Sequence, residues 1–137
     1  MFKKLARSLR GHDHWFAEWW SSVLLMAVGI YGFCVPDGFI IQQSFVDGFL
    51  QVLPFNLWEV LFIMFGLFQF MALRYESLIG RGIAAFLASS LLIWGTLNIA
   101  VYGQWHFSLI GWGIFSAINL YALFRITRGI EQYHEPL

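Results

Sequence analysis

Charged residues are scarce in this chain of 137 residues, making up 12% of it against roughly a quarter in an average soluble domain. Hydrophobic residues make up 59%, and the mean hydropathy is +0.67. A soluble domain of this size has too little interior to bury so much apolar surface. Eight basic residues balance eight acidic ones, so no excess of positive charge indicates a nucleic-acid partner. The composition excludes soluble globular and disordered proteins and predicts an integral membrane protein.

Cysteine is also scarce, because Cys34 is the only one, and this excludes a disulfide within the chain. The sequence lacks the HExxH, P-loop, CxxC and G-x-S-x-G patterns of common metal, nucleotide, redox and hydrolase sites. His14 and Glu18 are spaced to share a helical face, but no distant third ligand accompanies them. We therefore predict no enzymatic activity, no cofactor and no metal site.

Long apolar runs are what the sequence does contain. Four of them reach the roughly 20 residues that a helix needs to span a bilayer, at about 15–35, 55–73, 82–102 and 107–124. Hydrocarbon offers no hydrogen-bond partner to an unpaired backbone group, so each run is predicted to be helical. The expected fold is an all-α four-helix bundle forming a single transmembrane domain over residues 1–137.

The basic residues indicate the orientation of this bundle. They precede the first span, separate the second from the third, or follow the fourth: Lys3, Lys4, Arg7, Arg10, Arg74, Arg81, Arg125 and Arg128. The opposite loops, 36–54 and 103–106, contain no Lys or Arg. Because basic residues concentrate on the cytoplasmic side of membrane proteins, both termini are predicted to be cytoplasmic.

Two segments outside the spans have amphipathic patterns. Residues 1–10 place Phe2, Leu5, Ala6 and Leu9 on one side of a helix. The cations of this segment are predicted to contact lipid head groups: Lys3, Lys4, Arg7 and Arg10. In the outer loop 36–54, a helix over about 39–52 would align Ile41, Phe45, Phe49 and Val52. It is predicted to lie on the outer membrane surface or to pack over the bundle.

A few polar residues interrupt the apolar spans. Glu59 and Asn98 fall at similar depths near the outer side, and together with His106 they form a candidate polar cluster. The alternative is that Glu59 is tolerated by its position in the first turns of its helix and by interfacial water. Gln69 and Asn119 match in depth nearer the inner side, and we predict a hydrogen bond between their amides.

Small residues spaced four apart predict where helices approach closely. They lie on the third and fourth spans: Gly80, Ala84, Ala88, Gly113 and Ala117. The short turn between these spans favours a contact between them within one chain. A contact between subunits of a homo-oligomer is the alternative.

The arrangement resembles small four-span inner-membrane proteins of tailed phages and prophages. The likeness runs over about 100 residues and is carried by Trp58-Glu59, Gly66, Ala72-Leu73, Arg81, Trp94 and the Asn119–Arg125 ending. It implies a bacterial inner membrane. The favoured function is a non-enzymatic module that binds or modulates another membrane component. The alternatives are a holin-like pore, and a small-solute carrier or membrane enzyme that uses Glu59 and His106.

Overall fold

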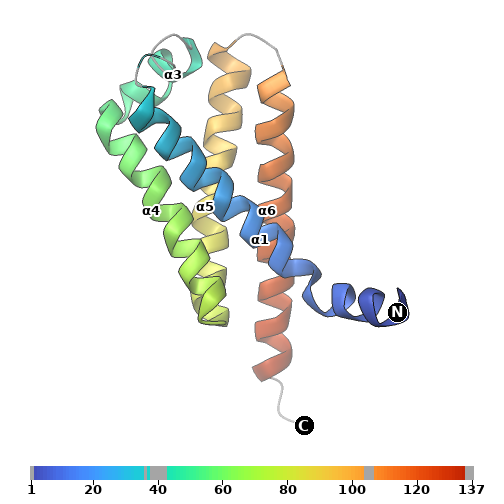
Figure 1. Ribbon diagram of the computed structural model, residues 1–137. Helices are drawn as coiled ribbons and strands as arrows, with labels where there is room; N and C mark the ends of the chain where they lie inside the picture. The colour runs from blue at the N-terminus through green and yellow to red at the C-terminus, as the bar shows by residue number, and fades with distance from the viewer. Residues whose placement is uncertain (1, 36, 38–42, 104–106, 135–137) are drawn as a thin grey trace.

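The computed structural model describes residues 2–35, 37, 43–103 and 107–134, and the regular structure in that part of the chain is helical. Four long helices alternate in direction (Figure 1): α1 (Phe2–Cys34), α4 (Phe55–Arg74), α5 (Leu78–Tyr102) and α6 (Phe107–His134). A short helix α3 (Gln43–Asp47) and a 3-10 turn η1 (Phe49–Gln51) lie between α1 and α4. We call the end with both chain termini the termini end, and the end with α3 the loop end.

All four long helices contain segments long and apolar enough to cross a membrane: Phe16–Cys34, Phe55–Arg74, Leu78–Tyr102 and Phe107–Arg128. The all-helical fold and the four apolar helices are therefore confirmed. The boundaries differ at the termini end. Helix α5 begins at Leu78 instead of residue 82, because the Ser77 side chain caps it by accepting a hydrogen bond from the Gly80 N–H at 3.2 Å. Helix α6 continues past 124 to His134.

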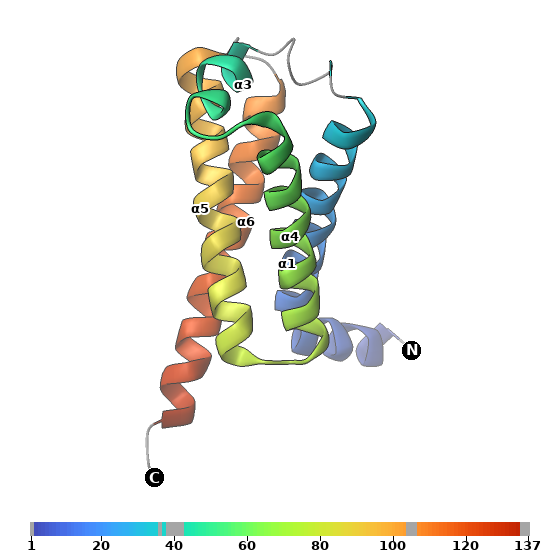
Figure 2. The ribbon, with the colours of Figure 1, turned by 90° about the vertical axis from the view of Figure 1, so that its left-hand side faces the viewer.

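The first helix is longer than predicted. Residues 1–10 and 15–35 were expected to form separate helices, but α1 is continuous from Phe2 to Cys34. Its first turns bend away from the bundle at the termini end, in both views (Figures 1 and 2). The predicted head-group contacts of its four cations concern side chains that lie outside the described part of the structure.

The bundle is built from two closely packed helix pairs, α1 with α4 and α5 with α6. Helix α1 crosses α4 obliquely (Figure 1). A Cβ atom added to Gly66 would lie 2.7 Å from the carbonyl oxygen of Ser22 and 2.8 Å from the backbone nitrogen of Met26. One added to Gly29 would lie 2.8 Å from the carbonyl oxygen of Glu59. These two glycines allow the backbones of α1 and α4 to touch.

The predicted packing face on the last two spans is correct only for α5. Ala84 and Ala88 are buried and Gly80 is half-buried, but on α6 Gly113 is half-buried and Ala117 is exposed. The reason is that α6 presents large side chains to small ones. A Cβ atom on Gly95 would lie 2.6 Å from Cε3 of Trp112. The α5–α6 contact therefore fits a large ring onto Gly95 and also pairs small residues, Thr96 with Ser116, that differ from the predicted ones.

The segment between α1 and α4 covers the loop end of the bundle. The predicted single helix over 39–52 is wrong, because the chain breaks at Gly48 into α3 and η1. Phe45 and Phe49 are buried and stack with ring centroids 5.1 Å apart, whereas Val52 is exposed. The Trp58 indole donates a hydrogen bond to the Phe49 carbonyl oxygen at 2.7 Å. This segment is packed over the bundle, the second of the two expected placements; Ile41 lies outside the described residues.

Candidate functional site

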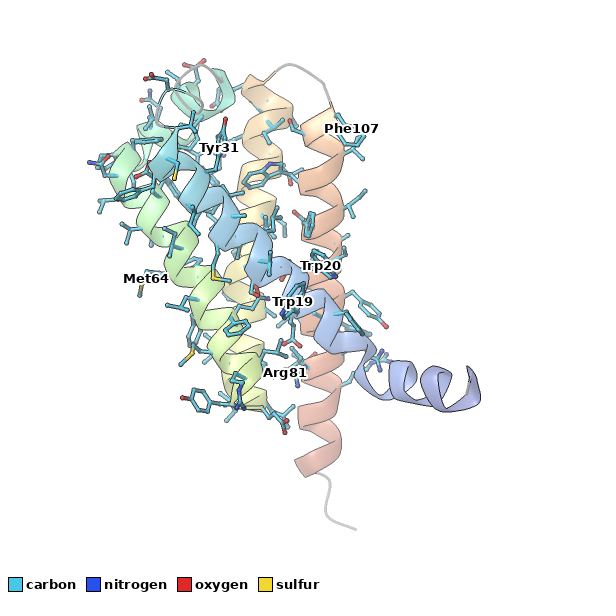
Figure 3. All side chains as sticks on the ribbon, in the orientation of Figure 1. Trp19, Trp20, Tyr31, Met64, Arg81 and Phe107 are labelled. Atoms are coloured by element: carbon cyan, nitrogen blue, oxygen red, sulfur yellow. The ribbon has the colours of Figure 1, made fainter. Side chains whose placement is uncertain are left out.

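Glu18, on α1, is the most deeply buried of the charged residues whose burial the structure describes. Its side chain is 1% exposed and accepts hydrogen bonds from the guanidinium of Arg81, on α5. Nε of Arg81 lies 3.0 Å from Oε1 and 3.2 Å from Oε2, and Nη2 also donates to Oε2. Figure 3 shows Arg81 within the lower part of the bundle. This two-pronged ion pair ties α1 to α5 across 63 residues of sequence.

Sequence reasoning missed this pair. Arg81 was assigned to the loop before the third span, and Glu18 was considered only as a metal ligand beside His14. The structure engages both carboxylate oxygens of Glu18 with Arg81, so the metal interpretation of Glu18 has no support. The available signal was a single acidic residue inside the first apolar run, Glu18, and a single basic residue at the start of the third, Arg81, at the same end of the bundle.

The predicted amide pair comes together. Nε2 of Gln69 on α4 donates to Oδ1 of Asn119 on α6 at 3.1 Å, and both side chains are buried. The Asn119 Nδ2 also donates to the carbonyl oxygen of Phe115 at 2.9 Å. Oε1 of Gln69 and the hydroxyl of Ser21 are buried without a hydrogen-bond partner in the structure. The hydrogen bond joins α4 to α6, and these two helices belong to different close helix pairs.

Together these residues form a buried polar layer in the half of the bundle nearer the termini, with every long helix contributing: Glu18, Ser21, Gln69, Arg81 and Asn119. Buried polar groups are stabilised by partners inside the protein, which Glu18, Arg81 and the paired amides have and the Ser21 hydroxyl lacks. The layer links α1 to α5 and α4 to α6. These are cross-links between the two close helix pairs, so its role is to hold the pairs together.

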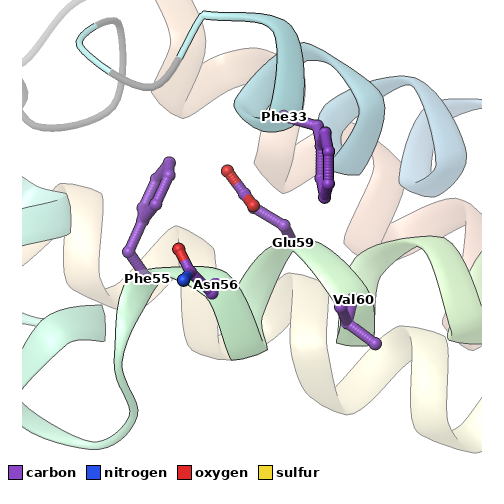
Figure 4. A pocket seen from close by; sticks show the side chains of 5 residues that line it. All are labelled: Phe33, Phe55, Asn56, Glu59 and Val60. Carbon is purple, nitrogen blue, oxygen red and sulfur yellow. The ribbon is translucent and has the colours of Figure 1, made fainter.

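A cleft of about 330 Å³ lies at the loop end between α1 and α4. It is lined by Phe33, Phe55, Asn56, Glu59 and Val60 (Figure 4). The Glu59 carboxylate extends between the two phenylalanine side chains, and the Asn56 amide lies beside it. The Glu59 residue is only 6% exposed, because α1 covers its backbone side. A carboxylate held in an apolar cleft is a chemically distinct feature of the loop end.

The predicted cluster of Glu59, Asn98 and His106 is not seen as one site, although Glu59 and Asn98 both lie toward the loop end. Asn98 is buried on α5, where its Nδ2 donates to the Trp94 carbonyl oxygen of its own helix at 2.8 Å. The Glu59 cleft is lined from α1 and α4 instead. His106 lies outside the described residues. The two described members therefore serve different places, and the cluster has no shared cavity in the described part of the chain.

No metal centre is visible within residues 2–35, 37, 43–103 and 107–134, where no three His, Cys, Asp or Glu side chains gather. In the described part of the chain, the candidate site residues are the Glu18–Arg81 ion pair, the Gln69–Asn119 amide pair and the cleft carboxylate of Glu59. Comparison with protein-family models, with curated proteins and with solved structures found no match to this chain.

Proposed function

We propose that this protein spans the bacterial inner membrane four times with both termini in the cytoplasm. Support comes from the outward faces of the four long helices, which carry large apolar side chains such as Ile30, Met64, Leu97 and Ile114. Met64 points away from the bundle in Figure 3. The exposed arginines of the described residues, Arg74, Arg125 and Arg128, occupy the termini end, which the positive-inside rule places in the cytoplasm.

Reporter fusions test this orientation. Fusions after Asp47 and after Leu137 are expected to report opposite compartments, with Leu137 cytoplasmic. A third fusion after Glu76, in the α4–α5 turn, is the internal control and should agree with Leu137. If Asp47 and Leu137 report the same compartment, the four-span orientation is contradicted.

Within that membrane, we infer that the protein is a non-enzymatic module that binds another membrane protein through α6. The observation that carries this inference is that α6 is the span least covered by its own chain. Its outward residues include Ile110, Ile114 and Phe124, and its last turns extend beyond the other helices at the termini end (Figures 1 and 2).

The chemistry of α6 at the termini end indicates the kind of partner. The Arg128 guanidinium lies over the Phe124 ring, 4.3 Å from its centroid, and Arg125 donates to the Tyr121 hydroxyl at 3.1 Å. Large exposed apolar side chains contact lipid as readily as protein, so we assign the specificity of this contact to the polar groups at the end of α6. A membrane helix with acidic residues at its cytoplasmic end would complement α6.

Photo-cross-linking in living cells tests this surface. A photoreactive residue at Ile114 on α6 is compared with one at Met64 on α4, because both side chains are exposed to a similar extent, 53% and 54%. We expect a discrete protein adduct from position 114 only, and its loss when Arg125 and Arg128 are both changed to Glu. Equal labelling at both positions, or lipid adducts alone, would contradict the module; adducts to a second copy would replace it with a homo-oligomer.

A further inference from the structure

The Glu59 carboxylate has no hydrogen-bond or ion-pair partner among the described residues, although only 6% of the residue is exposed. It also points into an open cleft instead of into packed protein (Figure 4). Its oxygens are therefore reached from outside only through the cleft, and a carboxylate with so little access to water and no counter-charge is costly. Among the residues that the structure describes, no side chain neutralises Glu59, which favours a counter-charge supplied by a ligand.

The loop end holds no Lys or Arg for this purpose, and its histidine, His106, lies outside the described residues. The sequence has no Lys or Arg between Arg10 and Arg74, or between Arg81 and Arg125. Glu59 lies fifteen residues before Arg74, about 22 Å along a helix. The nearby charges at the loop end are acidic, from Asp37 and Asp47. The negative charges of Asp37 and Asp47 therefore attract cations to this end of the bundle in addition to Glu59.

The walls of the cleft select among cations. Phe33 and Phe55 present aromatic rings on either side of the carboxylate (Figure 4), and a ring face attracts a cation within about 6 Å of its centroid. Ca²⁺ takes about six to eight oxygen ligands, whereas the polar groups lining this cleft are one carboxylate and the Asn56 amide.

We propose that this cleft is a binding site for a monovalent organic cation, an ammonium group that carries apolar substituents. The ammonium pairs with Glu59, and the substituents contact Phe33, Phe55 and Val60. Two sources share this chemistry: the head group of an ethanolamine phospholipid in the adjacent leaflet, and a free amphiphilic amine. The site lies at the opposite end from the α6 arginines, so cation binding there does not depend on whether α6 contacts a partner.

The free-amine source is tested with benzyltrimethylammonium, titrated calorimetrically into the purified full chain in a non-ionic maltoside micelle. The neutral carbon analogue neopentylbenzene is the matched probe. We expect saturable binding of the cation, at least about tenfold weaker binding to Glu59→Gln (about 1.4 kcal/mol at 25 °C), and a smaller, few-fold loss for Phe33→Leu. Glu76→Gln, which removes an exposed carboxylate at the other end, should bind like the unchanged protein.

The lipid source is tested by native mass spectrometry after release from nanodiscs of phosphatidylethanolamine and phosphatidylglycerol. Retained phosphatidylethanolamine that is lost in Glu59→Gln identifies the head group as ligand; cation binding without retained lipid identifies a free amine. The proposal is overturned if the neutral analogue binds equally, if Glu59→Gln binds equally, or if neither source binds. Circular dichroism and elution volume report whether each variant is folded, and Glu59→Asp provides a charged variant that should keep part of the binding.

Discussion

The Glu18–Arg81 pair is the costliest arrangement of single residues in this molecule. Each group loses most of its hydration, since Glu18 is 1% and Arg81 is 5% exposed. Their mutual attraction offsets that loss only because the guanidinium reaches both carboxylate oxygens. Removing one member therefore harms the fold more than removing both, because a single change leaves a buried charge without its partner.

A double-mutant cycle tests this reasoning. Glu18→Leu and Arg81→Met, made singly, should each lower the free energy of unfolding by about 3 to 5 kcal/mol, because each leaves the partner charge buried and unpaired. The double variant Glu18→Leu/Arg81→Met should lie within about 1 kcal/mol of the unchanged protein, because apolar replacement of a buried pair is often neutral. Unfolding in mixed micelles with increasing SDS measures these differences.

Arg74→Met is the control for the cycle, because Arg74 is exposed at the same end and its loss should change stability by less than about 0.5 kcal/mol. If the Glu18→Leu/Arg81→Met variant is as unstable as the sum of the single changes, the two residues act separately and the ion pair has no coupling role.

Depth along the spans predicted one polar pair and missed the other. Gln69 and Asn119 lie well inside long apolar runs, so counting residues to the nearest arginine was enough to match them. Arg81 lies where an apolar run begins, and an arginine there is usually interfacial. Only the Ser77 cap, which starts α5 earlier, moves Arg81 inside the helix. A hydroxyl that caps a helix is a local detail, and hydropathy cannot register it.

At the scale of elements, the close crossing of α1 and α4 organises the bundle. Backbone atoms of α1 face Gly66, and backbone atoms of α4 face Gly29. Close approach increases van der Waals contact along the whole crossing, which is the main attraction between helices when the surroundings are equally apolar. Even one methyl group at the crossing would force the two helices apart, since backbone cannot rotate away as a side chain can.

Gly66→Ala tests the crossing. We expect it to lower the free energy of unfolding by about 2 to 3 kcal/mol, the range of overpacking in a tight core, despite the better helix propensity of alanine. Gly111→Ala on α6 is the matched control, because its added Cβ would meet no atom within 4 Å, so stability should stay equal or rise slightly. Equal stability of both variants in the SDS titration would show that the crossing is loose.

Hydropathy predicted where the helices are but could not predict which faces meet. In a soluble protein the apolar stripe marks the buried face, whereas here the outward and the buried faces of the helices are both largely apolar. Helix α6 illustrates this, because spacing favoured Gly113 and Ala117 while the contact uses Trp112 and Ser116, whose hydroxyl lies 3.2 Å from that of Thr96. The pairing of α1 with α4 depends on two glycines that carry no hydropathic signal.

At the scale of the whole molecule, most of the polar side chains within the four apolar helices lie in the interior of the bundle. Buried polar side chains in the described spans come from all four helices: Glu18, Ser21, Ser22, Glu59, Gln69, Arg81, Ser89, Asn98, Ser116 and Asn119. The outward mid-span positions are mostly apolar, such as Met64, Phe86, Leu97 and Ile114; Ser90 is exposed on α5, where its hydroxyl donates to the Phe86 carbonyl oxygen of the same helix at 2.9 Å. A water-filled hole between several copies would need the opposite arrangement, with a polar stripe on an outward face to line it.

This arrangement predicts that the protein does not open the membrane. Cells that express it strongly should keep their membrane potential and continue to grow, because copies that meet through apolar faces leave no wetted path between them. A potential-sensitive dye followed after induction measures this, with an inactive control expressed from the same promoter and a known ionophore as the positive control. Placing a polar stripe on α6 by changing Ile110, Ile114 and Ala117 to Ser should, by contrast, introduce leakage if copies associate through that helix. Rapid loss of the dye signal with the unchanged protein would restore the holin-like alternative and would mean that the four helices rearrange when copies assemble.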